Sequence, residues 1–207
     1  MARRPIIAGN WKMNNTIAEG VALVKELMPL VKDAKNVDVV ACPTATALAA
    51  VAEAVKGSNI HIGAQNVHWE KSGAYTGEIS TAMLKEIGVD YCVLGHSERR
   101  EYFGETDEGV NKRAKAAYAA GITPIICCGE PLEIREANTY IDFVTKQIKA
   151  ALDGFSSLPM NRSGRLARAR RRPSSRPKKF ALPFARRWPR CSTRTRRKKS
   201  ASSTAAV

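Results

Sequence analysis

The chain has 207 residues and a formal net charge of +15, with 34 Lys and Arg against 19 Asp and Glu. This length is enough for one or two domains with a buried core. No run of about 18 apolar residues is present to span a membrane. The start, MARRPIIAGNWKM, lacks the apolar region and cleavage site of a signal peptide, so we expect a soluble cytoplasmic protein.

The positive charge is confined to the last 48 residues of the chain. Residues 1–159 contain 17 Lys and Arg and all 19 acidic residues, whereas residues 160–207 contain 17 basic residues and no acid. The net charges are therefore −2 and +17. Beyond Pro159 there is no strand of useful length and no amphipathic helix, so this segment cannot bury enough apolar surface to fold. We predict a folded part at 1–157 and a disordered basic tail at 158–207.

The first part alternates short β-rich runs with longer helical segments. The predicted strands are 5–11, 37–43, 59–64, 89–94 and 122–128. The predicted helices are one capped by Thr16 and ending near Leu30, followed by 44–55, 79–87, 107–120 and 139–152. Five β/α units in a row predict a parallel sheet with crossover helices, either doubly wound or closed as a β/α barrel. A long polar loop, 66–78, follows the third strand, and a polar turn is expected at 95–100.

The five cysteines show no zinc-ligand spacing, and we expect no metal and no cofactor. They are Cys42, Cys92, Cys127, Cys128 and Cys191. Three of them lie in apolar runs typical of buried strands, which indicates reduced core thiols. Neighbours on a strand point to opposite faces, so the adjacent pair is not expected to act as a redox centre.

Polar residues gather where the predicted strands end, which is where chemistry is found in α/β sheets. They are Asn10 and Lys12, Gln65, His96 and Glu98, and Cys128 and Glu130. A lysine beside a histidine and a carboxylate suits an anionic substrate whose carbonyl group is polarised. By residue type alone this indicates a phosphorylated carbonyl compound. A lone lysine is more often a surface charge, and a lone histidine after a strand is more often structural. His61 and His68 are expected to serve in packing or hydrogen bonding.

Five strings, in this order, carry a more specific signal. They are AGNWKMN at 8–14, GAQNVHW at 63–69, GAYTGEIS at 73–80, YCVLGHSERR at 91–100 and CCGE at 127–130. Together they resemble the triosephosphate isomerase family over residues 4–154. The resemblance implies a (β/α)8 barrel of which about the first five β/α units are present. It also implies an isomerase of glycolysis and gluconeogenesis, which interconverts dihydroxyacetone phosphate and glyceraldehyde 3-phosphate through an enediolate.

The resemblance assigns a role to each matching residue. Lys12 would hold the substrate and offset enediolate charge, with Asn10 lining the same pocket. His96 would be the catalytic electrophile, as the neutral imidazole that is an established property of this family. Glu98, Cys128 and Glu130 would support the site from behind these residues. Gln65 and the 66–78 loop, with Thr76 near its tip, resemble the loop that inserts into the second subunit of a homodimer.

Two motifs of the family are absent from the sequence. The general base is a glutamate after strand six, in a string such as YEPIWAIGTG, and a phosphate-binding YGGS follows strand seven. Synonymous codons for 160–169, regrouped by one base, read YEPIWAIGTG, and codons for 199–207 in the same phase read VRIQYGGS. We therefore hypothesise a frameshift between Phe155 and Pro159, and we expect the chain as written to be inactive.

The alternative is a non-enzymatic, partly unfolded polypeptide whose basic tail binds nucleic acid. A charge of +17 over 48 residues would bind phosphate backbones in a salt-dependent way. Aromatic residues are sparse there, and no reader motif or repeat is present. Nucleic-acid binding by the tail is therefore expected to be incidental.

Overall fold

The computed structural model describes residues 4–155 and the backbone of residues 167–170. The chain divides into two units, Met1–Arg171 and Arg172–Val207. The second unit lies wholly outside the described residues. The prediction that the basic tail is disordered therefore falls, apart from 167–170, on residues that the structure does not describe.

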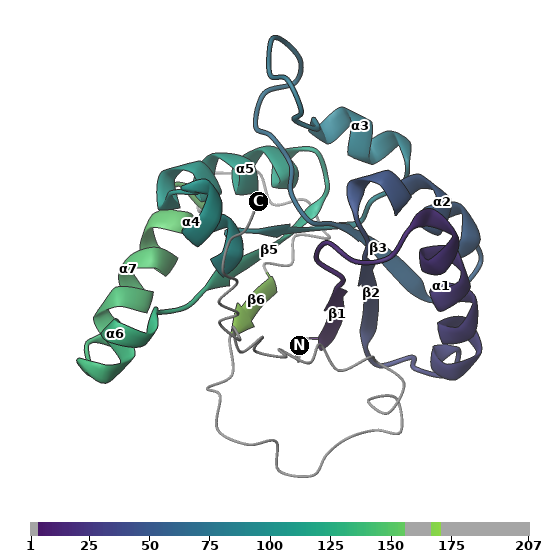
Figure 1. Cartoon of the computed structure of the whole chain (residues 1–207), viewed down its shortest axis with the longest axis horizontal. Helices are drawn as coiled ribbons and strands as arrows, with labels where there is room; N and C mark the ends of the chain where they lie inside the picture. The colour runs from purple at the N-terminus through teal and green to yellow at the C-terminus, as the bar shows by residue number, and fades with distance from the viewer. Residues whose placement is uncertain (1–3, 156–166, 171–207) are drawn as a thin grey trace, which may run out of the picture. The chain divides into compact units, whose positions relative to one another are not determined.

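The described strands form one parallel sheet that curves as an open half-barrel (Figure 1). They follow one another in the sheet in sequence order: β1 Ile6–Asn10, β2 Asp38–Cys42, β3 Ile60–Ala64, β4 Tyr91–Leu94, β5 Thr123–Cys128 and β6 Ala167–Arg170. Because all five predicted strands are present and parallel, the predicted β/α barrel class is confirmed for the first five units. Their carboxyl ends lie along one edge of the sheet, where the candidate site residues were expected.

Helices follow the strands along the chain. They are α1 Ile17–Val31, α2 Leu48–Ala54, α3 Thr81–Glu86, α4 Ser97–Phe103, α5 Asp107–Ala119, α6 Leu132–Glu136 and α7 Tyr140–Ala151, with a 3-10 turn, η1, at Ala45–Ala47. No helix among the described residues is both long and apolar enough to cross a bilayer. The start of α1 was predicted correctly, because the Thr16 side chain accepts from the Glu19 N–H and the Glu19 carboxylate accepts from the Thr16 N–H.

Side chains on the two faces of the sheet enter two separate clusters, as expected for strand periodicity. One face packs against the helices. The largest fully buried side chains of the cluster between this face and the helices include Leu94 of β4 and, from the helices, Val24, Val51, Leu84 and Val110. The inner face carries a smaller cluster of Val40, Cys42, Tyr91, Val93 and Ile125, with Ile6 and Cys127 packed beside it. The first cluster attaches the helices to the sheet and fixes where the strand ends lie.

Several predicted element boundaries were wrong. Residues 97–103 form α4 and not a polar turn; no residue of α4 is buried, so no apolar periodicity marks it. The same holds for α6, which was not predicted. The helix expected at 44–55 begins as the 3-10 turn η1 before α2.

The sequence predicts no strand of useful length after Pro159, and among the described residues the structure has one strand of 4 residues there. Residues Ala167–Arg170 form β6, which pairs in parallel with β5 from Ile125 to Cys128. The backbone of β5 offers an unpaired edge that accepts hydrogen bonds from almost any extended segment, whatever its side chains. This explains how a segment without a strand-like sequence pairs there.

Candidate active site

Lys12, His96 and Glu98 lie together at the carboxyl ends of β1 and β4. The Lys12 ammonium forms an ion pair with Glu98 Oε1, and Glu98 Oε2 lies 3.4 Å from His96 Nδ1. The carboxylate therefore links the ends of two strands, through residues that are 86 positions apart in the sequence. About half of the Lys12 side chain is exposed, so its charge is available to a ligand from solution. The structure thus brings together three of the residues that the sequence singled out.

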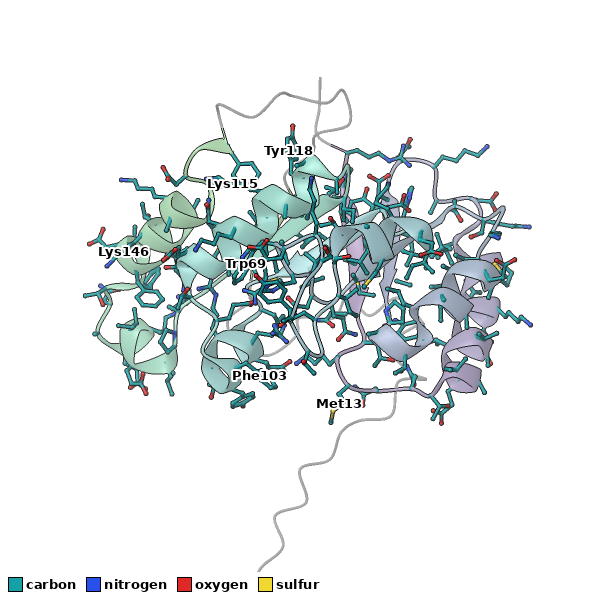
Figure 2. All side chains as sticks on the ribbon, turned by 90° about the horizontal axis from the view of Figure 1, so that it is seen from above. Met13, Trp69, Phe103, Lys115, Tyr118 and Lys146 are labelled. Atoms are coloured by element: carbon teal, nitrogen blue, oxygen red, sulfur yellow. The ribbon has the colours of Figure 1, made fainter. Side chains whose placement is uncertain are left out.

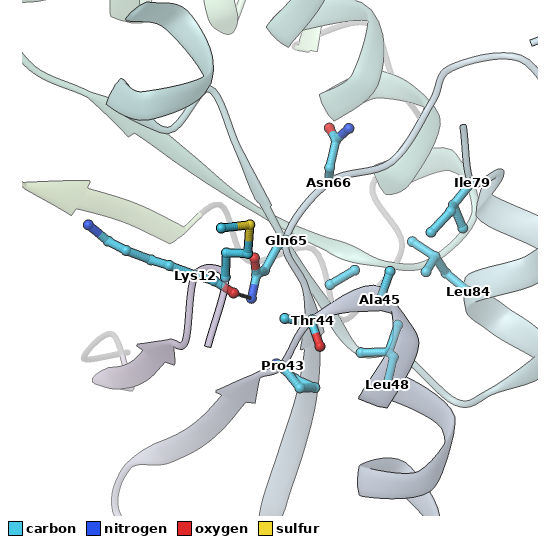
Figure 3. Close-up of a pocket in the computed structure, with 11 residues that line it drawn as sticks. Lys12, Pro43, Thr44, Ala45, Leu48, Gln65, Asn66, Ile79 and Leu84 are labelled. Atoms are coloured by element: carbon cyan, nitrogen blue, oxygen red, sulfur yellow. Dashed lines mark hydrogen bonds between the residues drawn. The ribbon is translucent and has the colours of Figure 1, made fainter. Parts of the chain in front are cut away.

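The backbone of Lys12 is held in an uncommon conformation. Its φ is +56°, in the left-handed region that costs a non-glycine residue on the order of 1 to 3 kcal/mol. Asn10 Oδ1 accepts from the Lys12 N–H at 3.0 Å, and Gln65 Nε2 donates to the Lys12 carbonyl at 2.9 Å. Figure 3 shows the Gln65 amide against this carbonyl, with the Lys12 side chain extending away from the neighbouring cavity. Asn10 and Gln65 therefore fix the direction of the Lys12 side chain.

His96 is the N-cap residue of α4. Its Nδ1 lies 3.3 Å from the Glu98 backbone N–H and 3.4 Å from Glu98 Oε2. One nitrogen cannot accept from the first and donate to the second in the same state. Since a backbone N–H is always a donor, we assign Nδ1 as an acceptor. The ring proton is then on Nε2, where it can donate to an oxygen of a bound molecule.

Other predicted site residues lie farther from this cluster or have other partners. Glu130 forms an ion pair with Arg135 of α6. Of the two adjacent cysteines, it is Cys127 that packs beside the inner cluster, while Cys128 ends β5. Thr76 is exposed near the tip of the 66–78 loop. The roles given to Cys128, Glu130 and Thr76 remain predictions.

The described cysteines are free thiols, as predicted; Cys191 lies outside the described residues. Burial raises the pKa of Cys42 to about 12 and that of Cys127 to about 11, and it raises the pKa of Cys92 well above its usual value. These three thiols therefore stay protonated and unreactive near neutral pH. No group of three or more His, Cys, Asp or Glu side chains in the described part of the chain could hold a metal ion.

The two other histidines make the packing and hydrogen-bonding contacts that were expected of them. His61 Nδ1 lies 3.1 Å from Asp90 Oδ2, and its ring meets the edge of Tyr91. His68 is buried in the 66–78 loop, with its ring 4.2 Å from that of Trp69 and 4.6 Å from that of Tyr75.

Sequence reasoning missed the buried charges behind His96. Arg100 Nε donates to the Gly95 carbonyl at 2.8 Å, and Glu105 Oε2 accepts from the Gly95 N–H at 3.1 Å. Arg113 Nη1 lies 3.1 Å from Glu105 Oε1. Glu105 and Arg113 are buried, whereas Arg100 is half-buried. Charged residues usually face solvent, so nothing in the local pattern marks Glu105 and Arg113 as buried.

A cavity of about 190 Å³ opens beside Lys12 at the carboxyl ends of β1, β2 and β3 (Figure 3). Its lining includes Met13, Thr44, Gln65, Asn66 and Leu84. Large apolar side chains are exposed as well: Met13 is 94% exposed and Phe103 69%, and Figure 2 shows both projecting from the same side of the molecule. Of these two residues, Met13 lines the cavity.

Consecutive parallel strands, outer helices, and a lysine and a histidine at the strand carboxyl ends define the first part of a β/α-barrel enzyme. The triosephosphate isomerase family model matches residues 5–162, and the chain belongs to this family. The triosephosphate isomerase of Clostridium acetobutylicum is 61% identical over 155 residues, which cover 75% of this chain and 62% of the relative. That of Clostridium botulinum strain Loch Maree is 62% identical over 154 residues.

A solved structure agrees with this assignment. The crystal structure of triosephosphate isomerase from Bartonella henselae has a TM-score of 0.69 and 40% sequence identity, over 73% of this chain and 63% of that one. The chain thus spans somewhat less than two thirds of the length of the proteins it matches.

Proposed function

We propose that this chain carries the lysine and histidine part of a triosephosphate isomerase site, which binds triose phosphates and polarises their carbonyl group. The observation that carries the proposal is the pair of contacts made by Glu98: its carboxylate forms an ion pair with the Lys12 ammonium, and its backbone N–H donates to Nδ1 of His96. These two contacts hold the lysine and the histidine close together at the strand ends. A bound anion can replace the carboxylate as the partner of Lys12, while the imidazole remains beside it.

The chemical roles follow from the charges and donors. Interconversion of dihydroxyacetone phosphate and glyceraldehyde 3-phosphate moves a proton between two carbons through an enediolate. Negative charge then develops on the two oxygens, and preorganised donors stabilise it. In our proposal Nε2–H of His96 donates to these oxygens, and Lys12 offsets their charge and that of the phosphate.

We further propose that this chain turns over slowly or not at all. Proton abstraction needs a general base, and the sequence contains no string like the YEPIWAIGTG that carries it in the family. Loss of a general base lowers a rate by roughly 10² to 10⁴-fold. Residues 158–207 would be the same gene read in a shifted frame. Reading the nucleotides across codons 150–165 tests this: if they do not encode the motif in the alternative frame, the hypothesis is wrong.

Binding is the sharper test of the site. The probe is 2-phosphoglycolate, a phosphate ester whose carboxylate stands where the substrate forms its enediolate. We expect saturable binding by titration calorimetry, at least tenfold weaker binding in Lys12→Met, and a smaller loss in His96→Gln. The control is Lys35→Met, which removes an exposed lysine from the loop between α1 and β2. Equal binding by wild type and Lys12→Met would overturn the proposal.

We propose a second copy of the chain as the partner of the apolar surface around Met13 and Phe103. The 66–78 loop would insert into the cavity beside Lys12 of that copy, as its resemblance to the family's dimer loop implies. Exposed apolar side chains are more stable when a partner covers them. We expect a dimer by light scattering, and a monomer when Met13→Lys places a charge on this surface. A monomeric wild-type chain would contradict the proposal.

As a triosephosphate isomerase, the protein would act in glycolysis and gluconeogenesis in the cytoplasm. The basic residues at 160–207 would add a nonspecific affinity for nucleic acid. A steep fall of that affinity with salt, uniform across sequences, is expected. A preferred sequence would favour the nucleic-acid-binding alternative.

A further inference from the structure

We propose that Trp69 and Arg113 position His96, by linking the 66–78 loop to the Gly95 backbone through the buried carboxylate of Glu105. The inference rests on the proposed function, because it assigns residues that hold the candidate electrophile in place. Its three steps join the loop to α5, α5 to the segment between α4 and α5, and that segment to the backbone of Gly95.

The first step joins Glu105 to the residue before His96. The Glu105 side chain is only 1% exposed, and its Oε2 accepts from the Gly95 N–H at 3.1 Å. The Gly95 carbonyl accepts from Arg100. Both backbone polar groups of Gly95 are thus held by charged side chains, and hydrogen bonds of this kind are stronger than neutral ones. A shift of Glu105 therefore moves the peptide group between Leu94 and Gly95, one residue before His96.

The second step joins Arg113 to Glu105. Arg113 Nη1 lies 3.1 Å from Glu105 Oε1, and Arg99 Nε lies 3.5 Å from the same oxygen. Arg113 is the closer partner, and its side chain is nearly buried. A buried carboxylate depends strongly on its partner charge, because loss of that partner leaves the charge uncompensated. The position of Arg113 therefore fixes the position of Glu105.

The third step joins the loop to Arg113. The Arg113 guanidinium carbon lies 4.9 Å from the centroid of the Trp69 ring, within the range of cation–π attraction. Arg113 Nε is buried and has no hydrogen-bond partner among the described residues. The guanidinium is therefore oriented by Glu105 and by the ring of Trp69. Trp69 also stacks on His68, whose ring meets Tyr75 near the loop tip.

These contacts form a continuous path from the exposed loop to the candidate electrophile. Contact with a partner at Tyr75 would shift the stacked rings, and the shift would reach Gly95 through Arg113 and Glu105. Binding of a second molecule to the 66–78 loop is thereby linked to the position of the His96 ring.

The experiment measures the His96 ring and the Gly95 amide by NMR in the full chain. Ring nitrogen shifts report which nitrogen carries the proton, and amide exchange reports the bond to Glu105. Trp69→Leu removes the aromatic face, whereas Trp69→Phe keeps one. Lys112→Met is the matched control, because Lys112 Nζ lies 5.6 Å over the same ring but is paired with Glu108.

We expect Trp69→Leu to speed Gly95 exchange roughly tenfold or more, as for a weakened hydrogen bond to a charged group. The His96 ring signals should shift with it. Trp69→Phe should stay near wild type and Lys112→Met should change neither signal. Arg113→Met should act on the same two signals, and its effect should not add to that of Trp69→Leu.

Unchanged Gly95 exchange and His96 shifts in Trp69→Leu would overturn the inference, as would equal effects of Lys112→Met. If Arg113→Met does not fold, the Trp69 variants decide the outcome. Neither signal requires turnover or ligand binding. A failure of the isomerase proposal therefore shows in the phosphoglycolate titration, and a failure of the coupling shows here.

Discussion

Gly95 is the residue whose backbone geometry most directly constrains the candidate site. Its φ is +68°, and a Cβ there would lie 2.8 Å from Val110 Cγ2, 2.9 Å from Arg100 Nη2 and 3.2 Å from the Cys127 carbonyl oxygen. Gly88 has a similar φ of +78°, but a Cβ there would meet nothing within 4 Å. A side chain at Gly88 would meet backbone strain alone, whereas a side chain at Gly95 would meet the same strain and steric overlap as well.

Gly95→Ala should be clearly more destabilising than Gly88→Ala. The left-handed backbone costs a non-glycine residue roughly 1 to 2 kcal/mol at either position. At Gly95 overpacking adds about 1 to 3 kcal/mol more. Urea unfolding of both variants measures the difference. Equal losses of unfolding free energy would show that Arg100 and Val110 yield freely to the added methyl group.

The buried thiol of Cys42 should make stability depend on alkaline pH. Its pKa is about 12 in the folded chain, against the ordinary 9.0 expected after unfolding. Because only the unfolded state loses this proton between those values, the contribution is complete below pH 9 and falls as the pH rises toward 12. The limiting slope for one thiol is about 1.4 kcal/mol per pH unit.

The measurement compares wild type with Cys42→Ala, by urea unfolding from neutral pH to alkaline pH. Other groups titrate in both proteins, so the informative quantity is the difference between their unfolding free energies. As the pH rises above about 9, wild type should lose unfolding free energy relative to Cys42→Ala, because the raised pKa keeps the thiol protonated only in the folded state. A difference that stays constant with pH would show that the thiol is not held protonated by the fold.

At the scale of single elements, α1 should depend on its N-cap more than α7 does. Thr16 forms a complete capping box with Glu19, whereas Thr139, the N-cap of α7, makes no side-chain cap hydrogen bond. Thr16→Ala should therefore cost about 1 kcal/mol of unfolding free energy, the usual value of such a cap. Thr139→Ala is the control and should cost much less. The reverse order would mean that α1 is held by packing alone.

Elements with a repeating apolar pattern were predictable from the sequence, and those without one were not. The five strands and the helices α1, α5 and α7 carry such patterns. No residue of α4 or α6 is buried, and β6 pairs through its backbone. Lys12, His96 and Glu98 were predicted as site residues because they lie in the sequence motifs at 8–14 and 91–100. Glu105 and Arg113 were missed because their burial depends on residues far apart in sequence.

At the scale of the whole molecule, the described sheet ends at β1 and β6. Within the part of the chain that the structure describes, β1 pairs with β2 alone. Closed barrels have no such edge, because their first and last strands pair. Ile7 of β1 is 63% exposed, which is unusual for an apolar side chain on a barrel strand. An exposed apolar edge strand promotes association with other chains.

Ile7→Lys should therefore reduce nonspecific association of the chain more than a matched change elsewhere. Leu30→Lys is the control, because Leu30 of α1 is 66% exposed but lies on a helix whose backbone bonds are internal. A charge on an edge strand opposes pairing with a second strand, whereas the same charge on a helix surface only adds solubility. Light scattering during thermal unfolding, at equal protein concentration and salt, gives the comparison. Equal suppression by both variants would show that net charge, and not the open edge of β1, controls association.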